Sequence, residues 1–198
     1  MTGTLSAEIA ASAARLIVEE GLEYGAAKRR AARDLGAMGR AVKLPGNDEV
    51  EHEVRAYIDL FHADSQPLEL AALRDIAAVW MERLASFRPF LTGAVWRGTA
   101  TRLNDIHIEL YCDDSKEAEL ALIDRRFDYE VSSGESSRGR EVDVLNLFVP
   151  GPDPSRRVRI ALTVLDYDDL RGALRADARG HPQRGGLAAL NALRGAAA

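Results

Sequence analysis

Apolar residues recur every three or four positions along residues 1–88, which is the spacing of helices that bury one face. Gly21 and Gly36 end the first two runs, as glycine often does after the last helical turn. A loop is expected from Gly39 to Gly46, then a helix capped by Asn47 and a fourth helix with Pro67 in its first turn. The residues predicted to face the core of this helical N-terminal module are Ile9, Ala13, Leu16, Ile17, Ala27, Ala31, Leu35, Val50, Val54, Tyr57, Ile58, Phe61, Leu70, Leu73, Ile76, Ala77, Trp80 and Leu84.

Near Pro89 the repeat of apolar residues shortens to two, which is the period of a strand with one buried face. The alternation is clearest from Asp105 to Cys112, where Asp105, His107, Glu109 and Tyr111 share one face. The other predicted strands are Phe90–Trp96, Phe127–Ser132, Val142–Val149 and Arg157–Leu165, and the predicted helices are Ser115–Arg125 and Leu187–Leu193. This order predicts an α+β fold with a helical module at residues 1–88, an α+β domain at 89–180 and a C-terminal tail with a short helix at 181–198.

Composition narrows the class of protein. Hydrophobic residues make up 46% of the 198 residues and charged residues 29%, as in ordinary globular domains. The net charge of -5 makes nucleic acid an unlikely partner, because a sequence-independent nucleic-acid binder presents a basic surface. No run approaches the roughly 18 apolar residues of a membrane span. The single cysteine, Cys112, has no internal partner for a disulfide, so the expected compartment is the cytoplasm.

One segment carries a recognisable chemical pattern. Gly93-Ala94-Val95-Trp96-Arg97-Gly98-Thr99-Ala100 is followed at once by Asn104-Asp105-Ile106-His107-Ile108. The layout resembles the signature of the DNA polymerase beta-type nucleotidyltransferase superfamily, in which Gly-Ser, a short spacer and Arg-Gly-x-Ala precede Ser-Asp-hydrophobic-Asp. The basic stretch Gly25 to Arg33 is similar to that of little-characterised proteobacterial nucleotidyltransferase-like proteins. The resemblance implies a nucleotidyltransferase-like mixed sheet.

The resemblance also implies roles for particular residues. The turn formed by Gly93, Ala94, Arg97 and Gly98 would hold the phosphates of a nucleoside triphosphate, with Arg159 as a further nucleotide-binding cation. Asp105 and His107 would occupy the catalytic positions and bind a divalent metal, Mg or Mn. Asp143 is the expected third metal ligand, and Glu109 is an alternative on the face of Asp105. Such metal ions clamp the attacking and leaving oxygens of the transferred group.

Three positions depart from the superfamily pattern. Ala94 stands where the pattern has serine, His107 where it has the second aspartate, and Arg159 where the last strand often has aspartate. Imidazole is a softer ligand than carboxylate and suits magnesium less well. Two functions therefore stay open: a transferase with a degenerate metal site, whose acceptor could be a protein, a small molecule or an RNA end, and a catalytically inactive binding or interaction module. Weak or absent magnesium binding is expected in the native chain.

Other chemically suggestive residues have simpler interpretations. Lys28, Arg29, Arg30 and Arg33 are read as a solvated helix face, with nucleic-acid binding as the less favoured alternative. The acids at Asp166, Asp168 and Asp169 are expected to cap the turn near Leu170, and Cys112 is expected to be a buried, unreactive thiol.

Overall fold

The computed structural model describes residues 2–37, 43–136, 139–153, 155–174, 176 and 180–196. Its contacts divide the chain into two compact units: a helical unit of Met1–Glu69 and Thr99–Asn104, and a sheet unit of Leu70–Gly98 and Asp105–Ala198. Most of the fourth helix therefore belongs to the sheet unit. The sequence prediction includes this helix in the helical module because its apolar residues repeat with a helical period. The C-terminal segment also belongs to the sheet unit. Part of the loop expected from Gly39 to Gly46 lies outside the described residues.

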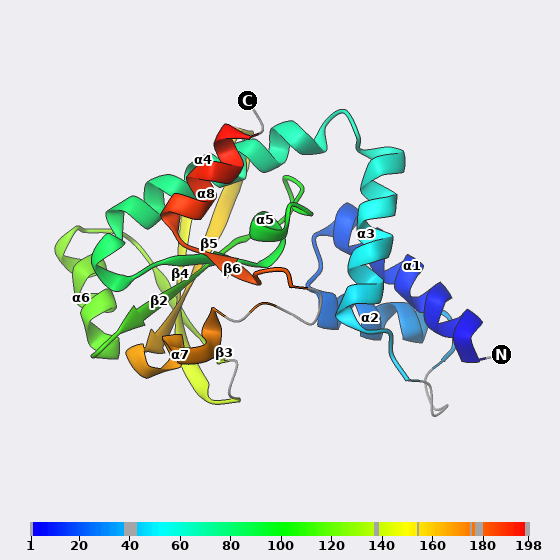
Figure 1. Cartoon of the computed structure of the whole chain (residues 1–198), viewed down its shortest axis with the longest axis horizontal. Coiled ribbons are helices and arrows are strands. Elements are labelled where there is room, and N and C mark those ends of the chain that lie inside the picture. The colour runs from blue at the N-terminus through cyan, green and yellow to red at the C-terminus, as the bar shows by residue number, and fades with distance from the viewer. Residues whose placement is uncertain are drawn as a thin grey trace. The chain divides into compact units, whose positions relative to one another are not determined.

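The helical unit contains α1 (Thr2–Glu20), α2 (Tyr24–Asp34), α3 (Asn47–Phe61) and the start of α4 (Gln66–Arg83) (Figure 1). Its core is formed by the predicted apolar faces of α1, α2 and α3. Two expected core residues are instead exposed, because Leu35 is the residue that ends α2 and Phe61 lies on the outer side of α3 against the Tyr57 ring. The helix α3 begins one residue after the cap at Gly46, whose N–H donates to the Glu49 carboxylate at 2.6 Å, so Asn47 is the first helical residue rather than the cap.

Six strands among the described residues form one sheet in the order β3-β4-β5-β2-β1-β6. They are β1 (Phe90–Thr92), β2 (Ile106–Cys112), β3 (Glu130–Glu135), β4 (Glu141–Pro150), β5 (Arg157–Asp166) and β6 (Arg184–Gly185). The central strands β2 and β5 are parallel and the other pairs are antiparallel, so the sheet is mixed. The structure thus confirms the predicted α+β fold, with helices first along the chain and then a mixed sheet.

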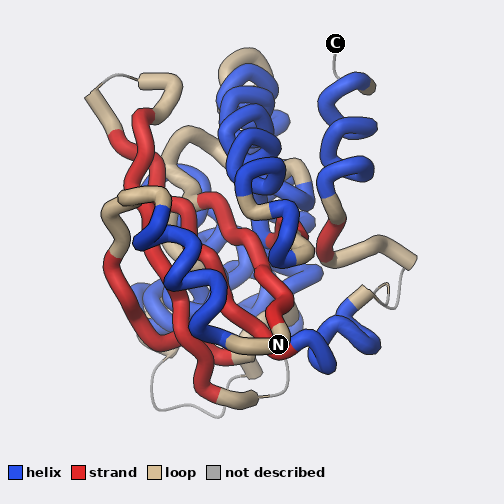
Figure 2. The backbone as a smooth tube through the Cα atoms, turned by 90° about the vertical axis from the view of Figure 1, so that its left-hand side faces the viewer, coloured by secondary structure: helices blue, strands red, loops and turns tan. Residues whose placement is uncertain are grey.

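Helices pack along this sheet. The helix α6 (Ser115–Asp124) contacts β2 and β5 and lies in front of the strands in Figure 2. The helix α8 (Leu187–Gly195) runs beside α4, where Arg194 Nε donates to the Asp75 carboxylate at 2.8 Å. Shorter elements are η1 (Ala85–Phe87), α5 (Gly93–Arg97), η2 (Tyr167–Asp169) and α7 (Leu170–Ala173). The cap of α6 is Asp114, one residue before the predicted Ser115, and Asp166 caps η2 as expected.

The two faces of β2 follow the predicted alternation. Ile106, Ile108 and Leu110 are fully buried, and Cys112 lies on the same apolar face with 3% exposure. Burial raises the pKa of the Cys112 thiol to about 11, in keeping with an unreactive cysteine. The strand expected from Phe90 to Trp96 ends at Thr92, because Gly93 turns the chain into α5. The strand β6 was not predicted, since two residues are too short to show a period.

Candidate functional site

The candidate site begins at α5, the short helix between β1 and β2. Gly93 precedes the turn with a φ of 71°, and Gly98 ends it with a φ of 82°, and such left-handed values favour glycine. A Cβ atom added to Gly93 would lie 3.4 Å from His107 Cδ2, so the glycine backbone packs directly on the His107 ring. This contact joins the start of α5 to β2.

The predicted phosphate-binding residues share one side of α5. Gly93, Ala94, Arg97 and Gly98 are all half-buried, whereas Val95 and Trp96 between them are buried in the core. The buried Arg74 side chain of α4 holds the end of the helix, donating to the Val95 carbonyl at 3.2 Å and the Trp96 carbonyl at 3.4 Å. Gly93, Ala94, Arg97 and Gly98 therefore lie together along a short helix and its C-terminal cap, and hydrogen bonds from Arg74 hold the end of this helix.

Strand register brings polar residues from several strands into one row. His107 of β2 lies opposite Thr92 of β1 and Ala161 of β5, and Ala161 lies opposite Asn146 of β4. Asp105 comes directly before β2, one residue before the Ile106–Ile160 pair. It therefore reaches the sheet beside Arg159, the residue before Ile160.

Arg159 binds Asp105 through two nitrogen atoms. Its Nε donates to Asp105 Oδ2 at 2.9 Å, and its Nη2 lies 2.7 Å from the same oxygen. The side chains are 35% and 30% exposed, so the pair is partly shielded from water. Two charge-assisted hydrogen bonds to one carboxylate make this a stronger pair than a typical surface contact. The basic residue that replaces the expected aspartate thus neutralises the first carboxylate of the site.

Asn146 holds Arg159 from the other side and was not predicted from the sequence. Its Oδ1 accepts from Arg159 Nη1 at 3.3 Å, and the residue is 4% exposed. Its amide nitrogen lies 2.9 Å from Ser132 Oγ, 3.2 Å from the Glu130 carbonyl and 3.2 Å from the Val144 carbonyl. Three acceptors around the nitrogen fix the amide so that its oxygen faces Arg159. An asparagine between the apolar residues Leu145 and Leu147 was the sequence signal for this contact.

Glu109, the alternative metal ligand, is engaged elsewhere. Its carboxylate accepts from Tyr111 at 2.6 Å and pairs with Arg184 of β6, whose Nη1 also lies 2.9 Å from the Tyr111 hydroxyl. Burial, followed by the hydrogen bond to Glu109, raises the pKa of Tyr111 above its ordinary value. The contacts among Glu109, Tyr111 and Arg184 connect the short strand β6 to β2. The Glu109 carboxylate is therefore already paired and is not available beside Asp105 as a metal ligand.

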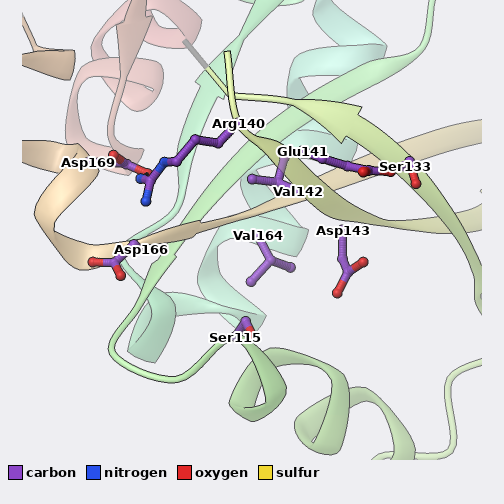
Figure 3. A pocket seen from close by; sticks show the side chains of 9 residues that line it. All are labelled: Ser115, Ser133, Arg140, Glu141, Val142, Asp143, Val164, Asp166 and Asp169. Carbon is purple, nitrogen blue, oxygen red and sulfur yellow. Dashed lines mark hydrogen bonds and ion pairs between the residues drawn. The ribbon is translucent and has the colours of Figure 1, made fainter. Parts of the chain in front are cut away.

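The structure does not bring Asp143 to Asp105. Val144 pairs with Thr163, and Thr163 pairs with Glu109, so Val144 lies on the Asp105 face and the preceding Asp143 lies on the opposite face. Figure 3 shows Asp143 pointing instead into a pocket that Ser115 and Val164 also line. The predicted grouping of these two acids fails because neighbouring residues of a strand point to opposite sides.

These residues fit a magnesium ion poorly. Asp105 and His107 do offer ligand atoms within 4.8 Å of each other. Magnesium prefers hard oxygen ligands in an octahedral arrangement, however, and His107 supplies imidazole. The Asp105 oxygen is already bound by Arg159, and neither Asp143 nor Glu109 completes the set. Asp105 and His107 thus lie close together, but Arg159 occupies the side of Asp105 on which a metal ion would need a free carboxylate oxygen.

Comparisons with known proteins do not assign a family. No protein-family model matches the chain, and no curated protein matches it. Among solved structures, one similar chain is Cid1 in complex with the UTP analogue UMPNPP, at 12% identity and a TM-score of 0.32. The match covers 58% of this chain and 36% of the Cid1 chain, so this chain spans little more than a third of that one. None of the helices in the described part of the chain has the length and apolar character of a membrane span.

Proposed function

We propose that this chain is a nucleotidyltransferase-like binding module that holds the phosphates of a nucleoside triphosphate and does not transfer the nucleotidyl group. The observation that carries the proposal is the double contact between Arg159 and Asp105. The resemblance implies that an aspartate at the position of Asp105 binds metal in a nucleotidyltransferase, whereas in this chain the Asp105 carboxylate is already paired with Arg159.

Electrostatics explains why this contact opposes catalysis. A divalent cation bound to Asp105 would lie within a few ångströms of the Arg159 guanidinium. Two unit charges about 4 Å apart interact by roughly 4 kcal/mol at an effective dielectric of about 20, and a divalent ion doubles the repulsion. A metal ion would therefore have to displace Arg159 from Asp105, and neither Asp143 nor Glu109 would join Asp105 as a ligand. The proposed module has lost the metal while keeping the phosphate-binding turn.

The turn at α5 supports phosphate binding. Its left-handed glycines let backbone approach a ligand closely, and its half-buried face carries Arg97 beside Gly98. Arg159 adds a second cation on the neighbouring strand. Arginine side chains bind phosphate oxygens directly, so Arg97 and Arg159 suit an anionic ligand such as a triphosphate. We keep the cytoplasm as the proposed location, since the buried Cys112 lies in no disulfide.

Thermal unfolding with added ligands tests this proposal. A triphosphate present at 100 times its Kd should stabilise the protein by about 2.7 kcal/mol. We expect stabilisation by at least one nucleoside triphosphate, no response to magnesium alone, and no release of pyrophosphate on incubation with nucleotide and acceptors. Asp105→Ala serves as the control for metal binding. Tight magnesium binding by the native protein that is lost in Asp105→Ala would instead identify an active transferase.

The proximity of Asp105 and His107 favours one second candidate, a transferase that uses manganese. Their ligand atoms lie within 4.8 Å, and manganese accepts imidazole more readily than magnesium does. This candidate predicts nucleotidyl transfer with manganese but not magnesium, and a gain of magnesium-dependent activity in His107→Asp. The absence of both activities would leave the binding module as the function.

A further inference from the structure

We propose that Arg159 takes the place of the divalent cation, so that the site binds a phosphate chain directly and without metal. This inference rests on the proposed function and names how the module recognises its ligand. Its basis is the way in which Arg159 is held between Asp105 and Asn146 with part of its guanidinium still available.

The hydrogen-bonding capacity of Arg159 is only partly used. A guanidinium has five N–H groups. Among the residues that the structure describes, Asp105 engages one on Nε and one on Nη2, and Asn146 engages one on Nη1, which leaves two of the five. The side chain is 35% exposed, so these remaining donors have access to solvent. Arginine N–H groups match the geometry of phosphate oxygens.

The polar contacts around Arg159 keep the guanidinium in place before a ligand arrives. Asp105 holds it from the position just before β2, and Asn146 holds it from β4. The Asn146 amide is itself oriented by Ser132 of β3, so one hydrogen-bonded chain crosses the neighbouring strands β3, β4 and β5 and ends at Asp105, just before β2. A receptor that is fixed in advance loses less side-chain freedom on binding, which favours affinity. Asn146 is therefore a positioning residue that acts through Arg159.

The charge balance of the site agrees with this role. Three carboxylates would carry three negative charges and would repel a phosphate chain unless a metal lay between them. Here Asp105 and Arg159 cancel, His107 replaces one acid, and Asp143 faces the other side of the sheet. Within the sheet unit, these three positions therefore do not present the set of negative charges that would need a bridging cation before a phosphate chain could approach Arg159.

Titration calorimetry with inorganic pyrophosphate and with ATP, each in EDTA and in magnesium, tests the inference. We expect both ligands to bind in EDTA with affinities within about threefold of those in magnesium. Arg159→Gln should weaken binding in EDTA about tenfold or more, which corresponds to about 1.4 kcal/mol. Arg159→Lys should recover part of this loss, because an ammonium keeps the charge without the fork of donors. Ser132→Ala and Asn146→Leu should weaken binding with Arg159 still present.

The matched control is Arg157→Gln, which removes the same charge two residues away on the same face of β5. Native-like circular dichroism and thermal unfolding establish that each variant is folded. Binding that requires magnesium in the native protein, or equal losses in Arg159→Gln and Arg157→Gln, would overturn the inference while leaving nucleotide binding intact. Failure of ATP and every other nucleoside triphosphate to bind under either condition would overturn the proposed function itself.

Discussion

A double-mutant cycle on Arg159 and Asp105 measures the contact on which the functional proposal depends. The cycle compares the free energy of unfolding of the native protein, Arg159→Ala, Asp105→Ala and the double variant. Its coupling energy isolates the pairwise interaction, because effects that each variant has elsewhere cancel. We expect each single variant to be destabilised, and the second substitution to cost less once the first partner is gone.

The expected magnitude follows from geometry and exposure. Fully exposed ion pairs contribute about 0.2–1 kcal/mol, whereas removing one partner of a buried pair costs about 3–5 kcal/mol. Arg159 and Asp105 are 35% and 30% exposed and share two short contacts, at 2.9 and 2.7 Å. We therefore expect a coupling energy of about 1–2 kcal/mol. In a chain of this length, a single variant that loses about 1–2 kcal/mol of stability should show a fall in Tm of about 2–8 °C.

Urea unfolding followed by tryptophan fluorescence is a suitable assay, since both tryptophans, Trp80 and Trp96, lie in the sheet unit. The control cycle uses Arg194 and Asp75, which lie 2.7 Å apart but are 37% and 62% exposed. That pair should show a coupling energy below about 1 kcal/mol. A coupling energy for Arg159 and Asp105 no larger than that of the control pair would refute the reasoning that Arg159 is a built part of the site.

Three further predictions concern other features. Gly93→Ala should lower the free energy of unfolding by about 1–2 kcal/mol in chemical denaturation, because it places a side chain at a φ of 71° against His107. The control is Gly36→Ala, which has a similar backbone constraint but no neighbouring atom within 4 Å. A smaller effect for Gly93→Ala than for Gly36→Ala would contradict the packing of Gly93 on His107. Cys112 should react slowly with a thiol reagent at pH 8 and rapidly only after unfolding, since burial raises its pKa to about 11; rapid labelling of the folded protein would count against this. Hydrogen bonds from His62 and Tyr57 lower the pKa of Glu19 below 4.5, so their stabilisation is present above that value and is lost as the pH falls through the lowered pKa. The Tm difference between native protein and Glu19→Gln should therefore shrink on acidification, and a constant difference would show that the charge plays no part.

Local pattern was sufficient for much of the fold. The apolar faces of α1, α2 and α3 repeat every three or four residues over more than two turns each, so they define helices without long-range information. Apolar and polar residues alternate from Asp105 through Leu110, at the start of β2, and this alternation predicted the face shared by Asp105, His107 and Glu109. The grouping of Gly93, Ala94, Arg97 and Gly98 also followed from their closeness along the chain.

Long-range pairing decided the chemistry of the site. Asp105 and Arg159 are 54 positions apart, and they meet only because β2 and β5 pair in parallel with one register. That pairing, together with the register of β4, also sends Asp143 to the opposite face and brings Asn146 to Arg159. A shift of one residue in a strand exchanges its two faces, and no local period specifies the partner strand or its register. The sequence by itself thus determined which residues are polar and which elements carry them, and the tertiary structure decided that a cation lies against the first acid of the site.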